Sequence, residues 1–222
     1  MDHSINNLLT IEKEIYQKIP NNLSSNKIPK IVAVSKTFPM NTILPLINHG
    51  HNDFGENKVQ ETIEKWQSIK SDFNHIKLHM VGKLQKNKVK HAVSIFDYIH
   101  SLDNLRLAEK ISNEQLKQNK DIKIFIQVNI GKEDSKGGVL ASELEEFYKK
   151  CIKDFGLNVV GFMCLPPNDS NVSLYFSKMK ILINKTDLKE LSMGMSNDYL
   201  DAIKFGSTYL RIGSKIFGNR NQ

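Results

Sequence analysis

Short apolar runs alternate with longer amphipathic segments along most of the chain. The first run, 31–34, is dominated by β-branched residues, a composition typical of a buried parallel strand rather than of a helix. The clearest is 122–130, in which Ile, Phe and Val recur. We predict eight strands, at 31–34, 52–56, 77–82, 97–101, 122–130, 158–164, 190–194 and 209–213.

Between these runs apolar residues recur every three or four positions, which predicts a helix after each strand. The helices are expected at 43–47, 59–69, 84–93, 105–118, 144–152, 172–183 and 197–205, with a short last one beginning near Lys215. A further helix is expected at 4–19, ahead of the first strand, with Ser4 as its N-cap. Pro20 ends that helix, and 21–27 form a polar loop.

Strict alternation of strands and helices favours a parallel sheet, and eight such units favour a closed (β/α)8 TIM barrel. We therefore predict a barrel of this kind with an extra N-terminal helix. An open, doubly wound sheet is the alternative. Since no linker rich in Pro, Gly or Ser divides the chain, residues 1–222 are expected to form a single domain.

The composition is that of an ordinary globular protein, with 222 residues, 40% hydrophobic and 25% charged. The net charge of +7 is compatible with phosphorylated ligands or weak nucleic-acid binding, although a general bias towards Lys, Asn and Ile also explains it. No apolar run has the length of a membrane span, and the N-terminus does not resemble a signal peptide. Cys151 and Cys164 form no metal or redox motif, so we expect a cytoplasmic protein with reduced thiols.

In a barrel, the residues that follow each strand meet at one mouth. Those positions are Lys36, 55–57, 82–85, Ser101, Asn129, 164–166, 192–196 and 211–214. Lys36 is either a solvated strand-end lysine, the more common case, or a partly desolvated amine that attacks carbonyl groups to form a Schiff base. The histidines lack metal-ligand spacing at these strand ends, and no P-loop, G-x-S-x-G or G-x-G-x-x-G motif is present.

The last two strand ends carry small residues ahead of helices, at 192–196 and 213–214. Such loops can simply make turns, but their backbone N–H groups can also converge on an anion, and barrels often hold a phosphate there. A lysine opposite a phosphate loop is the pairing expected of a pyridoxal phosphate site. Arg211 is either a surface or salt-bridge arginine or the partner of the cofactor's ring nitrogen. A guanidinium cannot accept the ring proton, so in the second case the electron sink is weak, which hints at a weak enzyme or a carrier.

Several blocks of the sequence are recognisable. They are VSKT at 34–37, FGENKVQE at 54–61, GFMCLPP at 161–167, SMGMSND at 192–198 and GSTYLRIGSKIFG at 206–218. They resemble the pyridoxal phosphate homeostasis protein family, single-domain relatives of the alanine racemase N-terminal barrel. The resemblance runs in matching order from the first helix to Gly218.

The resemblance implies a barrel that carries pyridoxal 5′-phosphate as an internal aldimine, without established turnover, and that helps to balance intracellular vitamin B6 and amino-acid pools. By residue, it implies that Lys36 forms the aldimine, that Arg211 meets the ring nitrogen and that Asn57 faces the cofactor. Phosphate contacts are implied for Ser196 and Gly213, and less directly for Ser207 and Thr208. Lys58 and Lys83 depart from the family pattern, which has Tyr and His there.

Three functions are compatible with this sequence to different degrees. The first is a non-catalytic, monomeric pyridoxal phosphate binder, with apo forms of cofactor-dependent enzymes as candidate recipients. The second is a weak racemase-like enzyme. Racemases of this kind take a second acid/base from a C-terminal domain and a partner subunit. Because the sequence stops at Gln222, we expect no such domain and no efficient racemase activity. The third is a nucleic-acid binder built on the basic stretch 83–91, but no aromatic residue interleaves that stretch, which favours a solvated helix face.

Overall fold

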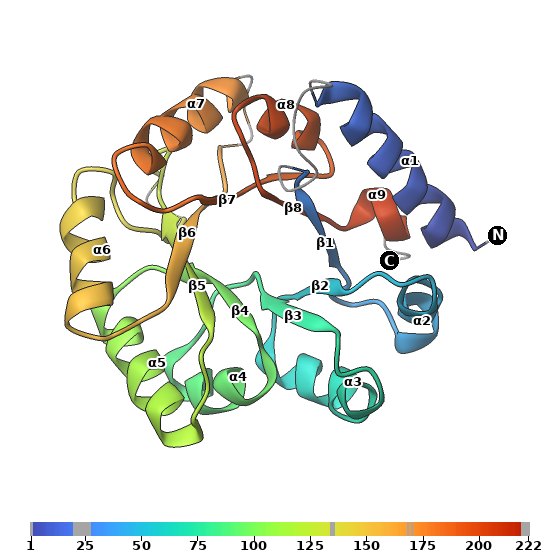
Figure 1. Ribbon diagram of the computed structural model, residues 1–222, viewed down its shortest axis with the longest axis horizontal. Helices are drawn as coiled ribbons and strands as arrows, with labels where there is room; N and C mark the ends of the chain where they lie inside the picture. Colours follow the sequence, from blue (N-terminus) through green and yellow to red (C-terminus); the bar gives the residue numbers. More distant parts are fainter. Residues whose placement is uncertain (1, 20–27, 134–135, 168, 170, 219–222) are drawn as a thin grey trace.

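The computed structural model describes residues 2–19, 28–133, 136–167, 169 and 171–218. Its centre is a closed barrel of eight parallel strands in sequence order, with β8 paired to β1 (Figure 1). The strands are β1 (Lys30–Val34), β2 (Asp53–Glu56), β3 (Lys77–Met80), β4 (Tyr98–Leu102), β5 (Lys123–Val128), β6 (Val159–Cys164), β7 (Glu190–Met195) and β8 (Tyr209–Ile212). The predicted (β/α)8 barrel is confirmed, and the open sheet is excluded.

Helices surround the barrel on its outer side (Figure 1). They are α1 (His3–Lys18), α2 (Met40–Asn48), α3 (Val59–Asp72), α4 (Val89–Ile95), α5 (Leu105–Gln118), α6 (Leu144–Lys153), α7 (Val172–Ile183), α8 (Tyr199–Lys204) and α9 (Ser214–Phe217), with a 3-10 turn at Lys86–Lys88. Among the described residues, no helix combines the length and apolarity needed to cross a bilayer.

Two local predictions were wrong. The basic helix expected at 84–93 begins only at Val89, because the polar residues Lys86–Lys88 form a 3-10 turn and offer no buried side chain to anchor a helical turn. The N-cap of α1 is Asp2 rather than Ser4. The Asp2 carboxylate accepts a hydrogen bond from the Ser4 backbone N–H at 2.8 Å, so Ser4 already lies inside the helix. The polar loop expected at 21–27 lies outside the described residues.

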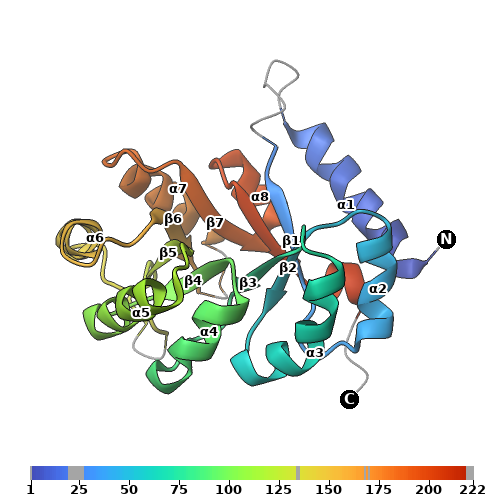
Figure 2. The ribbon, with the colours of Figure 1, turned by 60° about the horizontal axis from the view of Figure 1, so that its bottom comes forward.

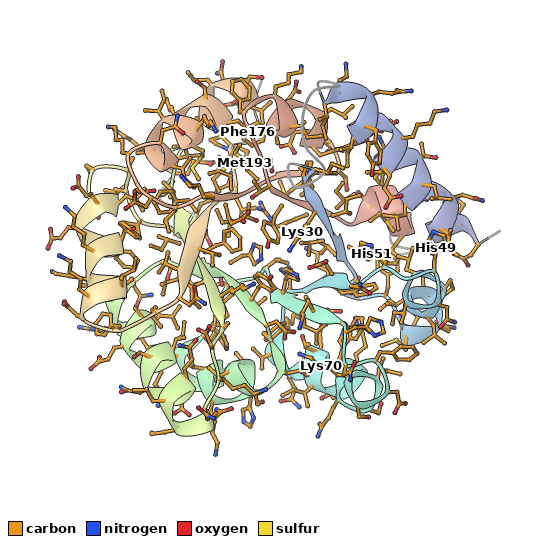
Figure 3. All side chains as sticks on the ribbon, in the orientation of Figure 1. Lys30, His49, His51, Lys70, Phe176 and Met193 are labelled. Carbon is orange, nitrogen blue, oxygen red and sulfur yellow. The ribbon has the colours of Figure 1, made fainter. Side chains whose placement is uncertain are left out.

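Strand alternation divides the buried side chains into two cores. The larger fills the space between strands and helices, as Phe176 on α7 and Met193 on β7 illustrate (Figure 3). The smaller lies inside the barrel and consists of Val32, Tyr98, Phe125, Met163 and Tyr209. This inner core shares the barrel with buried polar side chains.

The additional helix α1 packs against α8 and α9 beside the closing strands (Figure 1), and it lies next to α2 on the flank of the barrel (Figure 2). The Asn7 side chain donates to the Ile216 carbonyl at 2.9 Å, and the Lys215 ammonium donates to the Glu14 carboxylate at 2.8 Å. The hydroxyl of Tyr199 joins the same cluster. The first helix thereby holds the last one in place.

Candidate functional site

A cavity of about 1110 Å³ opens at the carboxyl ends of the strands. Its lining includes five of the seven residues predicted to bind a cofactor, namely Lys36, Asn57, Ser196, Arg211 and Gly213. The lining also includes Phe38, Lys83, Asp103, Gln127, Lys136 and Asp198, among others. A primary amine, a guanidinium and a carboxamide therefore share one space, as the barrel rule predicts for groups that follow parallel strands.

Lys36 follows β1 on a half-buried turn whose backbone is held from behind. The hydroxyl of the preceding Ser35 donates to Glu56 Oε1 at 2.8 Å. The Lys65 ammonium, from α3, donates to both the Ser35 carbonyl at 3.0 Å and Glu56 Oε1 at 2.9 Å. The next residue, Thr37, has φ of 67°, a conformation that needs such support. Glu56 is thus a structural anchor for the segment that presents Lys36.

Asn57 follows β2 and is kept in place by a glycine on the neighbouring strand end. Gly82 packs directly against the Asn57 backbone, and a Cβ atom at Gly82 would overlap the Asn57 carbonyl and Cα. Both residues line the cavity. A glycine at 82 is therefore a steric requirement of the loop that carries Asn57.

The loops after β7 and β8 meet through Ser196. Its hydroxyl oxygen accepts from the backbone N–H groups of Gly213 and Lys215, each at 3.3 Å. Both distances are at the long end of the hydrogen-bond range, so these hydrogen bonds are weak. The two N–H groups therefore point towards the same place and can still bind another acceptor. Gly213 also lies against β1, since a Cβ atom there would be 3.2 Å from the Val34 carbonyl oxygen. The arrangement offers a hydroxyl and backbone N–H groups to an anion at the end of the closing strand pair.

Arg211 projects into the barrel and is only 4% exposed, so the alternative of a surface arginine was wrong. Its Nη1 donates to Ser192 Oγ at 2.7 Å, and its Nη2 donates to the Cys164 carbonyl at 2.8 Å. Burial lowers the pKa of the guanidinium, and the neighbouring Asp198 opposes that effect. These two hydrogen bonds fix the orientation of the guanidinium and therefore the directions of its remaining N–H groups. Those groups can donate hydrogen bonds but cannot accept them.

Ser207 and Thr208 are not brought to the cavity. They precede β8, and residues before a parallel strand lie at the opposite end of the barrel from residues after it. The Ser207 hydroxyl donates to the Met193 carbonyl at 2.6 Å, and Thr208 Oγ1 accepts from the Leu191 N–H at 2.8 Å. Both side chains tie β8 to β7, and a phosphate contact from either does not fit this geometry.

Other lining residues went unrecognised in the sequence. Asp103, Gln127 and Lys136 come from β5 and from loops that follow strands, where no motif marks them. Ser192 was placed at the mouth, but it lies deeper and binds Arg211. The alternation of β7, which directs Leu191 and Met193 outwards, was the signal that could have placed it. Burial raises the pKa of the Cys164 thiol to about 12, so this cysteine is a poor nucleophile.

Comparison with known proteins gives the site a context. The family model "Alanine racemase, N-terminal domain" matches residues 16–221. The pyridoxal phosphate homeostasis protein of Aquifex aeolicus (strain VF5) is 38% identical over 200 residues, which cover 86% of this chain and 87% of that protein. The protein of the same name from Haemophilus influenzae is 34% identical over 226 residues, covering 97% of this chain and 95% of that protein.

The fold matches PipY of Synechococcus elongatus PCC7942, solved without and with PLP bound. The structure without PLP has a TM-score of 0.85 at 29% identity and covers 96% of this chain and 99% of PipY. The PLP-bound structure has a TM-score of 0.83 at 28% identity and covers 97% of this chain and 100% of PipY. Alanine racemase of Clostridium difficile 630 matches at a TM-score of 0.74 and 13% identity over 58% of its chain, which shows a common fold only. By its family model and its curated relatives, the chain belongs to the alanine racemase N-terminal domain family and, within it, to the pyridoxal phosphate homeostasis proteins.

Proposed function

We propose that this protein binds pyridoxal 5′-phosphate covalently through Lys36 and serves vitamin B6 and amino-acid homeostasis as a carrier rather than as an enzyme. The observation that carries the proposal is the single cavity that joins Lys36, Asn57, Ser196, Arg211 and Gly213. The names of the curated relatives and the PLP-bound PipY structure support it.

The donor set fits the chemical parts of this cofactor. When bound, pyridoxal phosphate supplies an aldehyde that reacts with primary amines and a ring that withdraws electrons. Lys36 would hold the aldehyde carbon. Ser196 and the backbone of Gly213 would hold the phosphate, and Arg211 would donate to the ring nitrogen. Asn57 lines the same cavity and would contact the cofactor from the side of β2.

The chemistry of Arg211 favours a carrier over a catalyst. A guanidinium would donate to the ring nitrogen and would leave no proton on it, so Arg211 would keep the electron withdrawal by the ring weak. Two contacts to neutral oxygens, at Ser192 and Cys164, hold Arg211 in that role. We further propose that bound cofactor passes to apo-enzymes that depend on it. We also propose that the carrier acts as a monomer.

A weak racemase-like enzyme is the second candidate. It is favoured by the fold shared with alanine racemase and by a cavity of about 1110 Å³, which has room for an amino acid beside the cofactor. Conversion of L- to D-amino acids by the purified protein tests it. Robust turnover that disappears in Lys36→Ala would establish the enzyme and refute the carrier.

The carrier proposal is tested by absorbance and covalent trapping. We expect the protein loaded with pyridoxal phosphate to be yellow, and borohydride to fix the cofactor on a peptide that contains Lys36. Lys36→Ala should remain colourless, whereas Lys83→Ala, which removes another lysine of the same cavity, should still be trapped. A colourless wild-type protein that takes up no added cofactor would refute the proposal. Loss of the visible band from this protein once it has been separated from an added apo-enzyme, with gain of that enzyme's activity, tests delivery.

A further inference from the structure

A continuous row of hydrogen bonds runs through the inside of the barrel and ends at Arg211. Asp53 Oδ1 lies 2.9 Å from His79 Nε2, and His79 Nδ1 lies 3.0 Å from His100 Nε2. His100 Nδ1 lies 2.8 Å from Ser192 Oγ, which accepts from Arg211 Nη1 at 2.7 Å. We call these five residues the polar relay. They come from β2, β3, β4, β7 and β8, and the relay spans the barrel from its amino end to the cavity.

The direction of every bond in the polar relay follows from its two ends. Arg211 can only donate, so Ser192 Oγ accepts from it and gives its own proton to His100 Nδ1. A neutral His100 then carries its proton on Nε2 and donates to His79 Nδ1. His79 in turn donates from Nε2 to the Asp53 carboxylate. The reverse order would leave the Ser192 proton without an acceptor in the relay and an unprotonated His79 nitrogen facing the carboxylate.

Burial and ring stacking keep both imidazoles in this state. Neither histidine is exposed to solvent, and burial lowers the pKa of each, which favours the neutral ring. His79 stacks on Tyr98 with ring centroids 4.2 Å apart, and His100 stacks on Phe125 at 4.3 Å. The rings therefore cannot turn over without disturbing the inner core.

At its far end, the polar relay terminates in Asp53, whose negative charge is opposite to that of Arg211. Asp53 is 21% exposed and lines a second cavity, of about 320 Å³, at the amino end of the barrel. Burial would raise the pKa of Asp53, but the His79 hydrogen bond and the charges of Lys30 and His51 outweigh this and lower it. Lys30 and His51 line the same cavity, and the Lys30 side chain extends inside the ring of strands (Figure 3). An anion and a cation thus face each other through a neutral, polarised row.

We propose that Asp53, His79, His100 and Ser192 are positioning residues for Arg211. A carboxylate at one end of the barrel then fixes the orientation of the guanidinium that meets a ligand at the other end. This rests on the proposed function only in that the ligand is pyridoxal phosphate. Without the Asp53 charge, the two imidazoles can reverse their tautomers and turn a donor towards Ser192. The Ser192 hydroxyl then competes with Arg211 instead of accepting from it along one fixed direction.

The tautomers can be measured without any cofactor. In ¹⁵N-histidine spectra of the cofactor-free protein, His79 and His100 should both carry the proton on Nε2 and accept at Nδ1. Asp53→Asn should change the tautomer signals of His79, and Asp53→Glu should restore them. A proton on His100 Nδ1 in the wild-type protein would overturn the relay. This measurement stands even if the protein binds no pyridoxal phosphate, so its failure is distinct from failure of the proposed function.

The effect on the ligand is tested by loading variants with pyridoxal phosphate. Asp53→Asn and Ser192→Ala should both shift the visible absorbance band and weaken cofactor affinity several-fold. Asp121→Asn is the control, because Asp121 also lies at the amino end, just before β5, and accepts from Asn158 Nδ2 at 2.8 Å outside the relay. It should leave the band in place. An unchanged band in a folded Asp53→Asn protein would refute the positioning role, and an equal shift in Asp121→Asn would reduce it to a general effect of lost surface charge.

Discussion

Replacing Glu56 by Gln should destabilise the barrel far more than its isosteric shape suggests. The carboxylate is 1% exposed, and its Oε1 accepts from Ser35, Lys65 and Trp66. Lys65 is only 13% exposed, so loss of the negative charge leaves a largely buried ammonium unpaired. Breaking such a pair from one side costs about 3–5 kcal/mol. In the Gln variant an NH2 group replaces one carboxylate oxygen. Oε2 has no hydrogen-bond partner within the described residues, so an NH2 group in its place would be a buried unpaired donor.

Because Gln still offers one acceptor oxygen, we take the lower figure, about 3 kcal/mol. For a chain of 222 residues this corresponds to a fall of about 6–12 °C in the thermal midpoint. Calorimetry or circular dichroism melting measures it. Glu61→Gln is the matched control from the same region, since its ion pair with Lys58 is exposed and worth less than about 1 kcal/mol.

The double variant Glu56→Gln/Lys65→Met separates charge from packing. Removing the stranded ammonium should recover part of the lost stability, because the unpaired charge is the main cost. If Glu56→Gln melts within the range of Glu61→Gln, or if the double variant is less stable than the single one, the buried ion pair does not anchor the Lys36 segment as described.

Three further outcomes are expected. Burial lowers the folded-state pKa of both relay histidines below the ordinary 6.5, so below that pH the unfolded chain binds more protons than the folded one. The free energy of unfolding should therefore fall as the pH falls from about 6.5, by up to about 1.4 kcal/mol per pH unit for each histidine. A thermal midpoint that stays level between pH 7 and pH 5 would contradict this. Gly82→Ala should weaken pyridoxal phosphate binding by displacing Asn57, while Gly50→Ala, which meets no neighbouring atom but strains a φ of +97°, should affect stability alone, as fluorescence titration can show. With a pKa of about 12, the Cys164 thiol should resist iodoacetamide at neutral pH in the folded protein and react once urea unfolds it; rapid labelling of the native state would show that the site is open.

Strand positions were the most predictable part of this fold. The alternation of short runs with amphipathic segments predicted all eight strands to within a few residues, and α5 and α7 have the predicted bounds. Strong amphipathic periods and buried runs leave few alternatives for such segments. The start of α4 was less predictable because the basic residues before Val89 have a good helix propensity. They nevertheless form a 3-10 turn, in which none of their side chains is buried.

Part of the cavity lining was predictable, because residues that follow parallel strands lie at the same mouth of a barrel. Lys36 and Arg211 come together because the carboxyl ends of parallel strands share one mouth. The same rule separates Ser207 and Thr208 from them, since both residues precede Tyr209, the first residue of β8. The polar relay could not be predicted, because alternation shows that His79 and His100 face inwards but not which inward residues lie at the same height. That depends on register across several strands, which the sequence does not state.

The pairing of β8 with β1 also decides when the cavity comes into existence. During synthesis Lys36 leaves the ribosome long before Ser196, Arg211 and Gly213, and it shares a cavity with them only after the last strand has closed the barrel. An unfinished chain therefore presents Lys36 as an ordinary solvated amine. A ligand that needs both ends of the chain stabilises only the closed barrel. Its capture marks the closure of the barrel.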